Sequence, residues 1–136
     1  MAGLTTTDAV AVAEFRSALR RFLRRSERIA RQSGLTPQRY LLLLMVKGAP
    51  EGREQSTVTE LADRLQLAQS TVTELVSRAE DAGLIAREQS QSDARVAYLR
   101  LTPEGERRLD LAFTALATER TQLREAIDVL DGSVIG

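Results

Sequence analysis

Five polar side chains that directly follow Ala68 could carry hydrogen-bonding chemistry. They are Gln69, Ser70, Thr71, Thr73 and Glu74. Gln pairs with adenine through two hydrogen bonds, Ser and Thr hydroxyls suit several bases, and Glu accepts from the amino group of cytosine. On one exposed helix face these side chains would read base edges in the major groove of double-stranded DNA. The same residue types also occur near helix starts as capping residues alone.

The chain contains neither Cys nor His. A thiol nucleophile, a disulfide framework and a cysteine redox switch are therefore excluded. Without His and Cys, conventional zinc and haem ligation and the commonest general base are absent as well. Carboxylates remain, but no spacing picks out a pair. We expect no enzyme activity, no catalytic residues, no metal and no cofactor.

The charge is zero overall but is segregated along the chain. Residues 1–50 carry nine basic and three acidic groups, for a net charge of +6, and residues 51–82 carry three and seven, for −4. Residues 83–101 are at +1 and residues 102–136 at −3. Arg accounts for 18 of the 19 basic residues, and it suits bidentate phosphate contacts. A stripe of Arg lies in the first helix, as a solvated outer face or as a contact for DNA or an acidic effector; its members are Arg16, Arg20, Arg24, Arg28 and Arg31.

Helical periodicity and capping signals predict the elements that position these residues. A helix over residues 7–33 ends at Gly34, and a buried helix follows with Thr36 as N-cap and Pro37 at its first position. Two short helices, 57–65 and about 68–82, precede the β-like pieces LIARE and VAYLRL, which flank the polar stretch QSQSDAR and predict a hairpin. One long helix begins at Thr102-Pro103. The fold class is mainly α with a small β-hairpin, in a single domain.

The heptapeptide QSTVTEL occurs at 55–61 and again at 69–75. In the first copy, Thr57 and Glu60 form a capping box that starts a helix. Helix-turn-helix spacing places Ala62 where the second helix crosses the first, and it requires that second helix to begin near Ala68. The second copy then lies inside a helix, with its apolar members facing inward and its polar members facing outward. The two copies therefore serve different roles and are not a structural repeat.

Both terminal helices carry apolar seams at steps of three and four residues. The seam residues that we expect at a dimer interface are Val12, Phe15 and Leu19 in the first helix and Phe113, Leu116, Leu123, Ile127 and Leu130 in the last, where Arg120 interrupts the spacing. Packing inside one chain is one explanation. A fold of this size has little central core for two such helices, so we expect pairing with a second copy, most simply by two-fold symmetry.

The stretch STVTELVSRAEDAGLIARE, followed by DARVAYLRLTPEG, resembles the signature of the MarR family of winged helix-turn-helix transcriptional regulators. Its most specific part is the pattern D-x-R…L-x-L-T-x-x-G, which is matched by Asp93, Arg95, Leu99, Leu101, Thr102 and Gly105. The resemblance covers nearly the whole chain. It implies a homodimer in which residues 1–35 and 103–136 are dimerisation helices and residues 36–102 form the winged DNA-binding lobe.

The resemblance also implies roles for individual residues. Residues 69–74 would lie in the major groove, and Arg95 at the wing tip would reach an adjacent minor groove. Asp93 would orient Arg78 or Arg87, which would otherwise contact phosphates. The sequence departs from the family pattern at Glu74 and Ala94, where basic residues are common. It also departs at Ala68, a poor N-cap, and at Gln66, which would need a left-handed backbone.

Members of this family are commonly repressors that respond to a small aromatic or phenolic molecule. For this chain, the resemblance implies an effector pocket at Phe22, Tyr40 and Leu44 and a near-palindromic operator. The alternative is a winged-helix scaffold that binds proteins and not DNA. No apolar run is long enough for a membrane span, and the N-terminus lacks the basic start of a secretory signal, so we expect a cytoplasmic protein with no membrane partner.

Overall fold

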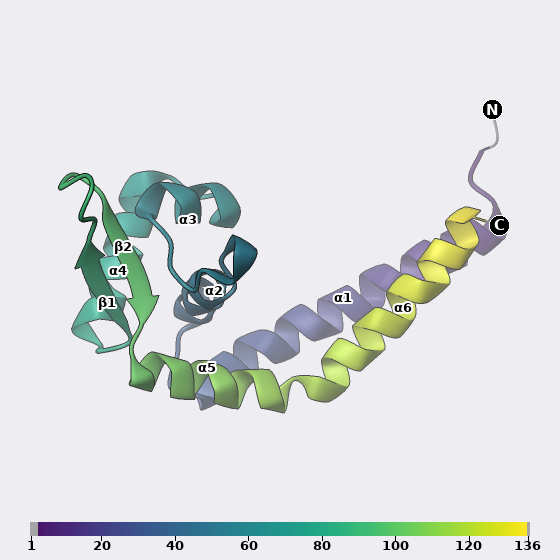
Figure 1. Cartoon of the computed structure of the whole chain (residues 1–136). Coiled ribbons are helices and arrows are strands. Elements are labelled where there is room, and N and C mark those ends of the chain that lie inside the picture. The colour runs from purple at the N-terminus through teal and green to yellow at the C-terminus, as the bar shows by residue number, and fades with distance from the viewer. Residues whose placement is uncertain (1–2, 136) are drawn as a thin grey trace. The chain divides into compact units, whose positions relative to one another are not determined.

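The computed structural model describes residues 3–135, with side chains to residue 132. Figure 1 shows the helices and the two strands in chain order. The elements are α1 (Thr6–Gln32), α2 (Pro37–Lys47), the 3-10 turn η1 (Pro50–Gly52), α3 (Val58–Leu65), α4 (Gln69–Asp81), β1 (Ile85–Gln89), β2 (Ala97–Leu101), α5 (Pro103–Ala115) and α6 (Ala117–Ile135). The predicted fold class, mainly helical with one small hairpin, is confirmed.

The chain divides into two compact units, residues 1–29 with 112–136 and residues 30–111. Their boundaries fall inside α1 and α5, and not at the ends of helices where the sequence led us to place them. The expected roles of residues 1–35 and 103–136 in dimerisation, and of residues 36–102 in DNA binding, stay predictions.

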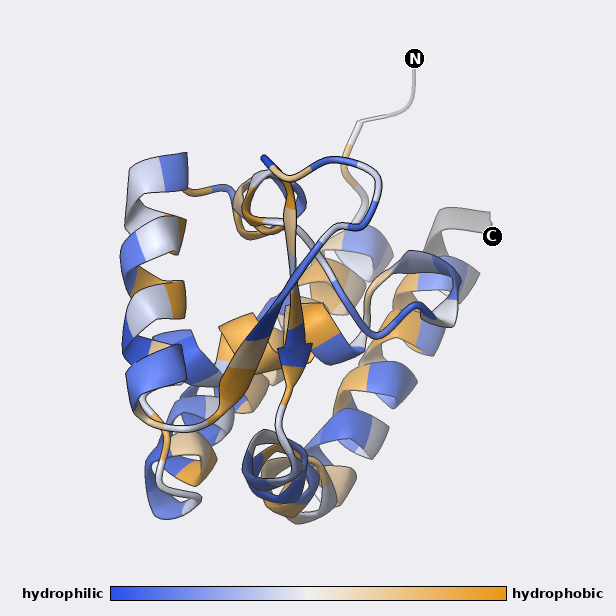
Figure 2. Cartoon of the chain, turned by 60° about the vertical axis from the view of Figure 1, so that its left-hand side comes forward, coloured by the Kyte–Doolittle hydropathy of each residue, from blue (hydrophilic) through white to orange (hydrophobic). Residues whose placement is uncertain are grey.

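The core of the unit of residues 30–111 is aliphatic. Its fully buried side chains are Leu42, Leu43, Val46, Leu61, Val72, Val76, Leu84 and Leu99. They come from α2, α3, α4 and the hairpin, so each element contributes its apolar face to one interior. Figure 2 shows the hydrophobic residues of these helices turned inward and the polar residues turned outward.

The hairpin pairs β1 with β2 in antiparallel register, from Ile85 opposite Leu101 to Gln89 opposite Ala97. A third backbone segment joins it at Ser56, whose N–H donates to the Leu99 carbonyl at 3.1 Å. The Leu99 N–H donates back to the Ser56 carbonyl at 2.8 Å. This single-residue bridge fixes the start of α3 to the hairpin of β1 and β2, which forms the wing. The sequence pattern did not predict this bridge.

Threonine caps fix three of the helix starts as predicted. Thr36 Oγ1 accepts from the Arg39 N–H at 3.1 Å, and Thr57 Oγ1 accepts from the Glu60 N–H at 3.2 Å. Thr102 Oγ1 accepts from the Gly105 N–H at 3.1 Å and donates to the Gly83 carbonyl at 2.6 Å. One part of the expected capping box differs, because the Glu60 carboxylate binds Arg53 Nη2 at 3.2 Å.

In the other unit, α1 and α6 run side by side in opposite directions (Figure 1). Arg25 Nε lies 3.2 Å from Glu119 Oε1 and joins the two helices near the start of α6. The prediction of one continuous C-terminal helix is wrong, because the helix is interrupted at Leu116, between α5 and α6. At the break, the Arg120 guanidinium lies 3.7 Å from the centre of the Phe113 ring and also donates to the Phe113 carbonyl. The Phe113 carbonyl lies in the last turn of α5, and in a continuous helix it would accept a backbone N–H. Here it accepts from the Arg120 side chain.

Candidate nucleic-acid interface

The helix-turn-helix predicted from the small residue Ala62 is present. Ala62 is buried on α3, and its carbonyl accepts from the Leu67 N–H at 3.1 Å across the turn. Gln66 adopts the left-handed conformation that the sequence required there, with φ 57° and ψ 46°. Its side-chain amide donates to the Asp63 carbonyl at 2.6 Å, which offsets part of the cost of this conformation.

Helix α4 begins at Gln69, next to the predicted start. Ala68 is its N-cap and supplies no side-chain acceptor, as expected for alanine. The inward-facing residues are all buried; they are Val72, Leu75, Val76 and Ala79. The predicted reading residues are all exposed; they are Gln69, Ser70, Thr71, Thr73 and Glu74. Burial of the apolar face thus fixes where α4 begins.

Each Arg on α4 and the hairpin lies beside a carboxylate of the same unit. Arg78 Nη2 is 2.5 Å from Glu74 Oε1, and Arg87 Nη2 is 2.9 Å from Glu80 Oε1. Arg95 Nε is 3.1 Å from Asp93 Oδ1, and Arg100 Nη1 is 3.9 Å from Glu88 Oε2. These pairs lie at the protein surface, where ion pairs contribute little to stability. Each of these guanidinium groups therefore has a carboxylate partner in this structure, and it can exchange that partner for another acceptor at little cost.

The expected role of Asp93 is corrected by these contacts. Asp93 binds neither Arg78 nor Arg87 but Arg95, two residues later in the wing. The reason is geometric: Glu74 precedes Arg78 by one helical turn, and Glu80 reaches Arg87, so both Arg residues already have an acidic neighbour. Glu80 and Glu88, which pair with Arg87 and Arg100, were not predicted as partners from the sequence.

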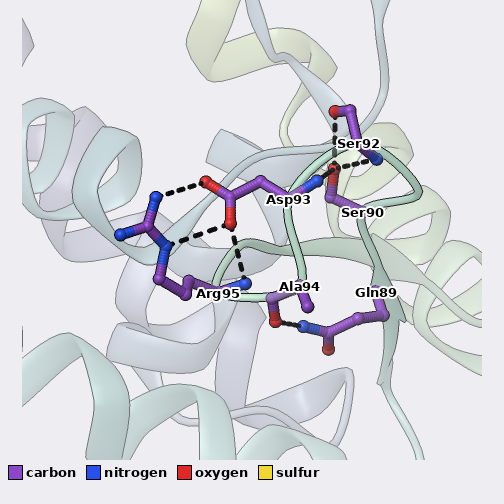
Figure 3. A network of polar contacts seen from close by, with 6 residues as sticks. All are labelled: Gln89, Ser90, Ser92, Asp93, Ala94 and Arg95. Carbon is purple, nitrogen blue, oxygen red and sulfur yellow. Dashed lines mark hydrogen bonds and ion pairs between the residues drawn. The ribbon is translucent and has the colours of Figure 1, made fainter.

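The wing tip is ordered by short-range hydrogen bonds (Figure 3). Ser90 Oγ accepts from the N–H groups of Ser92 and Asp93 at 3.3 and 3.2 Å, and the Gln89 amide donates to the Ala94 carbonyl. Asp93 accepts from the backbone N–H of Arg95 at 3.0 Å. Hydrogen bonds from the Arg95 side chain and backbone lower the pKa of the Asp93 carboxyl. The Arg95 side chain is 90% exposed, so the ordered turn presents one guanidinium to solvent.

The predicted dimer residues differ in exposure. Val12, Phe113 and Ile127 are exposed, whereas Leu116 is already buried at the break between α5 and α6. Four others are half-buried, namely Phe15, Leu19, Leu123 and Leu130. Further exposed apolar side chains that the sequence did not single out are Val10, Leu23 and Val129. These exposed apolar side chains on α1, α5 and α6 are ones that a protein–protein contact would bury.

The predicted effector residues fall in different units of the chain. Phe22 lines an open hollow of α1 and α6 together with Arg120, Leu123 and Ile127. Tyr40 is buried in the other unit, and Leu44 is exposed there. The effector pocket stays a prediction. Across residues 3–135, no cluster of acidic side chains is arranged to hold a metal ion, and no helix is long and apolar enough to cross a membrane.

Comparisons with known proteins agree with this geometry. A family model described as MarR family matches residues 33–96, which span the lobe from the end of α1 to the wing. A mutant of MarR from E. coli, complexed with operator DNA, superposes with a TM-score of 0.66 at 16% identity and covers 79% of this chain and 75% of its own. AbsC, a MarR family transcriptional regulator from Streptomyces coelicolor, superposes with a TM-score of 0.64 at 23% identity. The match covers 96% of this chain and 85% of AbsC. Overoxidised AbfR bound to DNA superposes with a TM-score of 0.59 at 28% identity, and the match covers 75% of each chain. No curated protein matches the sequence.

Proposed function

Because a MarR family model matches residues 33–96, we propose that this chain is a MarR family transcriptional regulator that binds double-stranded DNA sequence-specifically. The single observation that carries the proposal is the exposed polar face at the start of α4, beside a wing that presents Arg95. Related structures support it, because E. coli MarR is described in complex with operator DNA and AbfR as bound to DNA.

In this proposal α4 enters the major groove, which is about 12 Å wide and admits one helix. Its buried residues anchor it to the lobe, so Gln69, Ser70 and Thr73 face the base edges. Arg95 reaches the adjacent minor groove or its phosphates, Arg87 contacts a phosphate after leaving Glu80, and Arg78 enters the groove beside Glu74. Because a carboxylate competes with phosphate for each guanidinium, we expect modest affinity that falls steeply with salt.

We propose that the regulator acts as a homodimer. Support comes from the exposed apolar side chains of α1, α5 and α6, above all Phe113 on α5 and Val129 on α6, which are 55% and 58% exposed. A two-fold dimer presents two copies of α4, and such dimers read half-sites about one helical turn apart, or ~10 base pairs. A near-palindromic operator follows from the same symmetry.

We further propose that the protein is a repressor and that a small aromatic or phenolic molecule regulates its binding to DNA. Phe22 supplies an aromatic wall in the hollow of α1 and α6. The chain has no Cys for a thiol switch and neither Cys nor His for a zinc-type sensor. A ligand would have to bind one spacing of the two lobes more tightly than the other in order to change DNA affinity.

A protein-binding scaffold is the second candidate. The observation that favours it is the net charge of −4 over residues 51–82, together with the carboxylate beside every Arg of α4 and the hairpin. A scaffold of this type would bind a partner through the exposed face of α4 and would not need free guanidinium groups.

A gel shift against DNA upstream of the chain's own gene, at low and moderate salt, separates the two candidates. The regulator gives a shift that weakens with salt and is reduced by Arg95→Ala. The scaffold gives no salt-sensitive shift and no effect of Arg95→Ala. Sedimentation of the free protein at micromolar concentration tests the dimer: a single-chain mass rejects it, and Val129→Asp should convert a dimer to single chains.

A further inference from the structure

We infer that Glu74 is the specificity-determining residue of the reading helix, and that together with Arg78 it selects a cytosine–guanine pair in the operator half-site. The inference rests on the proposed DNA-binding function and assigns one base preference within it. It is carried by the place of Glu74 on α4, by its exposure and by its ion pair with Arg78.

Glu74 lies at the middle of the exposed face of α4. The buried residues Val72, Val76 and Ala79 fix which side of the helix faces the core. With 3.6 residues per turn, the opposite side carries Ser70, Glu74 and Ser77 in one row. All three are exposed, and the side chain of Glu74 is 63% exposed. A helix that enters a groove with this side forward places the Glu74 carboxylate against base edges and not against the lobe.

A carboxylate can only accept hydrogen bonds, and this limits the bases that it can face. In the major groove, the only base-edge donors are the amino groups of cytosine and adenine. Adenine carries its N7 acceptor next to that amino group, so N7 would repel the second carboxylate oxygen. Guanine and thymine present acceptors at the corresponding positions. Cytosine is therefore the base that Glu74 favours, and guanine and thymine in its place are repelled.

Arg78 completes the recognition of the pair. Its Nη2 atom lies 2.5 Å from Glu74 Oε1, one helical turn further along α4. Inside the groove, where water is displaced, this guanidinium keeps the carboxylate from being an unpaired charge. Its remaining N–H groups can donate to the O6 and N7 acceptors of guanine. The two side chains thus present an acceptor and donors that match cytosine and its paired guanine.

Selection of binding sites from a random double-stranded DNA library, followed by sequencing, tests the inference on the full-length protein. The wild-type chain should enrich a half-site with one fixed cytosine–guanine pair, and replacing that pair should weaken binding about tenfold. Glu74→Ala should lose the preference at that position alone. Glu74→Gln, whose amide both donates and accepts, should move it towards adenine.

The matched control is Asp63→Asn, which removes one negative charge from the exposed surface of α3 in the same unit. It should leave the selected sequence unchanged, so that a general electrostatic gain is separated from base reading. An unchanged sequence in both Glu74 variants would overturn this inference and leave the proposed function standing. Enrichment of no sequence by the wild-type chain would reject the proposed function and this inference together.

Discussion

The Nε and Nη2 atoms of Arg95 lie 3.1 and 3.3 Å from the two carboxylate oxygens of Asp93, and the Arg95 backbone N–H donates to the same carboxylate. One acidic side chain therefore fixes both the backbone turn and the direction of the most exposed guanidinium of the wing (Figure 3). Pre-ordering of this kind lowers the entropy that Arg95 loses when it contacts a phosphate or the minor groove.

Replacement of Arg95 by Ala should therefore weaken DNA binding and reduce its salt dependence. One lost phosphate contact lowers the slope of log K against log salt by about one. Binding would be titrated between 50 and 200 mM salt by fluorescence anisotropy. The charge-matched control is Arg107→Ala, because Arg107 is an exposed cation on α5 that is also paired with an acid. An equal slope for wild type and Arg95→Ala would place Arg95 away from the DNA.

Glu104 should give the chain a distinct loss of stability in acid. Hydrogen bonds from Arg107 and Arg108 lower the pKa of Glu104 from its ordinary 4.5 to about 2. A carboxyl group whose pKa is lower in the folded state stabilises that state above the unfolded pKa, and the contribution is lost as pH falls from 4.5 towards 2. Thermal unfolding measured across this range should show a falling midpoint.

Glu104→Gln should flatten that part of the profile, because an amide does not titrate. Glu51→Gln, an exposed position in the turn after α2, should leave the slope as it is in wild type. Profiles of equal steepness for wild type and Glu104→Gln would show that the acid transition comes from other carboxyl groups.

Adjacent hydroxyl groups at the start of α3 should have opposite effects on stability. Ser56 is fully buried, and its Oγ has no hydrogen-bond partner among the described residues, whereas Thr57 Oγ1 caps the helix. A buried polar group without a partner is destabilising, so Ser56→Ala should raise the free energy of unfolding by about 1 kcal/mol. Thr57→Ala should lower it by about 1 kcal/mol through loss of the cap. Urea unfolding of both variants measures this, and a loss of stability in Ser56→Ala would mean that the hydroxyl is bonded.

Local patterns in the sequence were enough to place most of the candidate interface. The apolar spacing of Val72, Leu75 and Val76 determined where α4 begins, and the need for a left-handed turn residue was met by Gln66. These features depend on neighbouring residues and on burial of one helix face. The exposure of Gln69 to Glu74 followed directly from them.

Features set by contacts between long side chains or distant residues could not be predicted in the same way. The break at Leu116 falls within an apolar spacing that only Arg120 interrupts, and it coincides with the contact between Arg120 and Phe113. The bridge between Ser56 and Leu99 joins distant segments and has no local signal. The partner of Asp93 depended on which Arg already had an acidic neighbour in space.

Two glycine positions should respond in opposite directions to the same change. At Gly105, near the start of α5, a Cβ atom would lie 2.2 Å from the Leu84 carbonyl oxygen. That oxygen also accepts from the Thr102 N–H at 3.0 Å, so the backbone cannot move away without weakening this bond between the hairpin and α5. Gly105→Ala should therefore lower the free energy of unfolding by about 2–3 kcal/mol.

At Gly132 in α6, a Cβ atom would meet nothing within 4 Å, and alanine favours a helix over glycine. Gly132→Ala should raise the free energy of unfolding by about 0.5–1 kcal/mol. Urea unfolding monitored by circular dichroism measures both changes, with the wild-type chain as reference. Because the two variants add the same methyl group, a general effect of side-chain size cannot produce opposite signs. A stable Gly105→Ala variant would show that α5 does not approach the Leu84 backbone as closely as described.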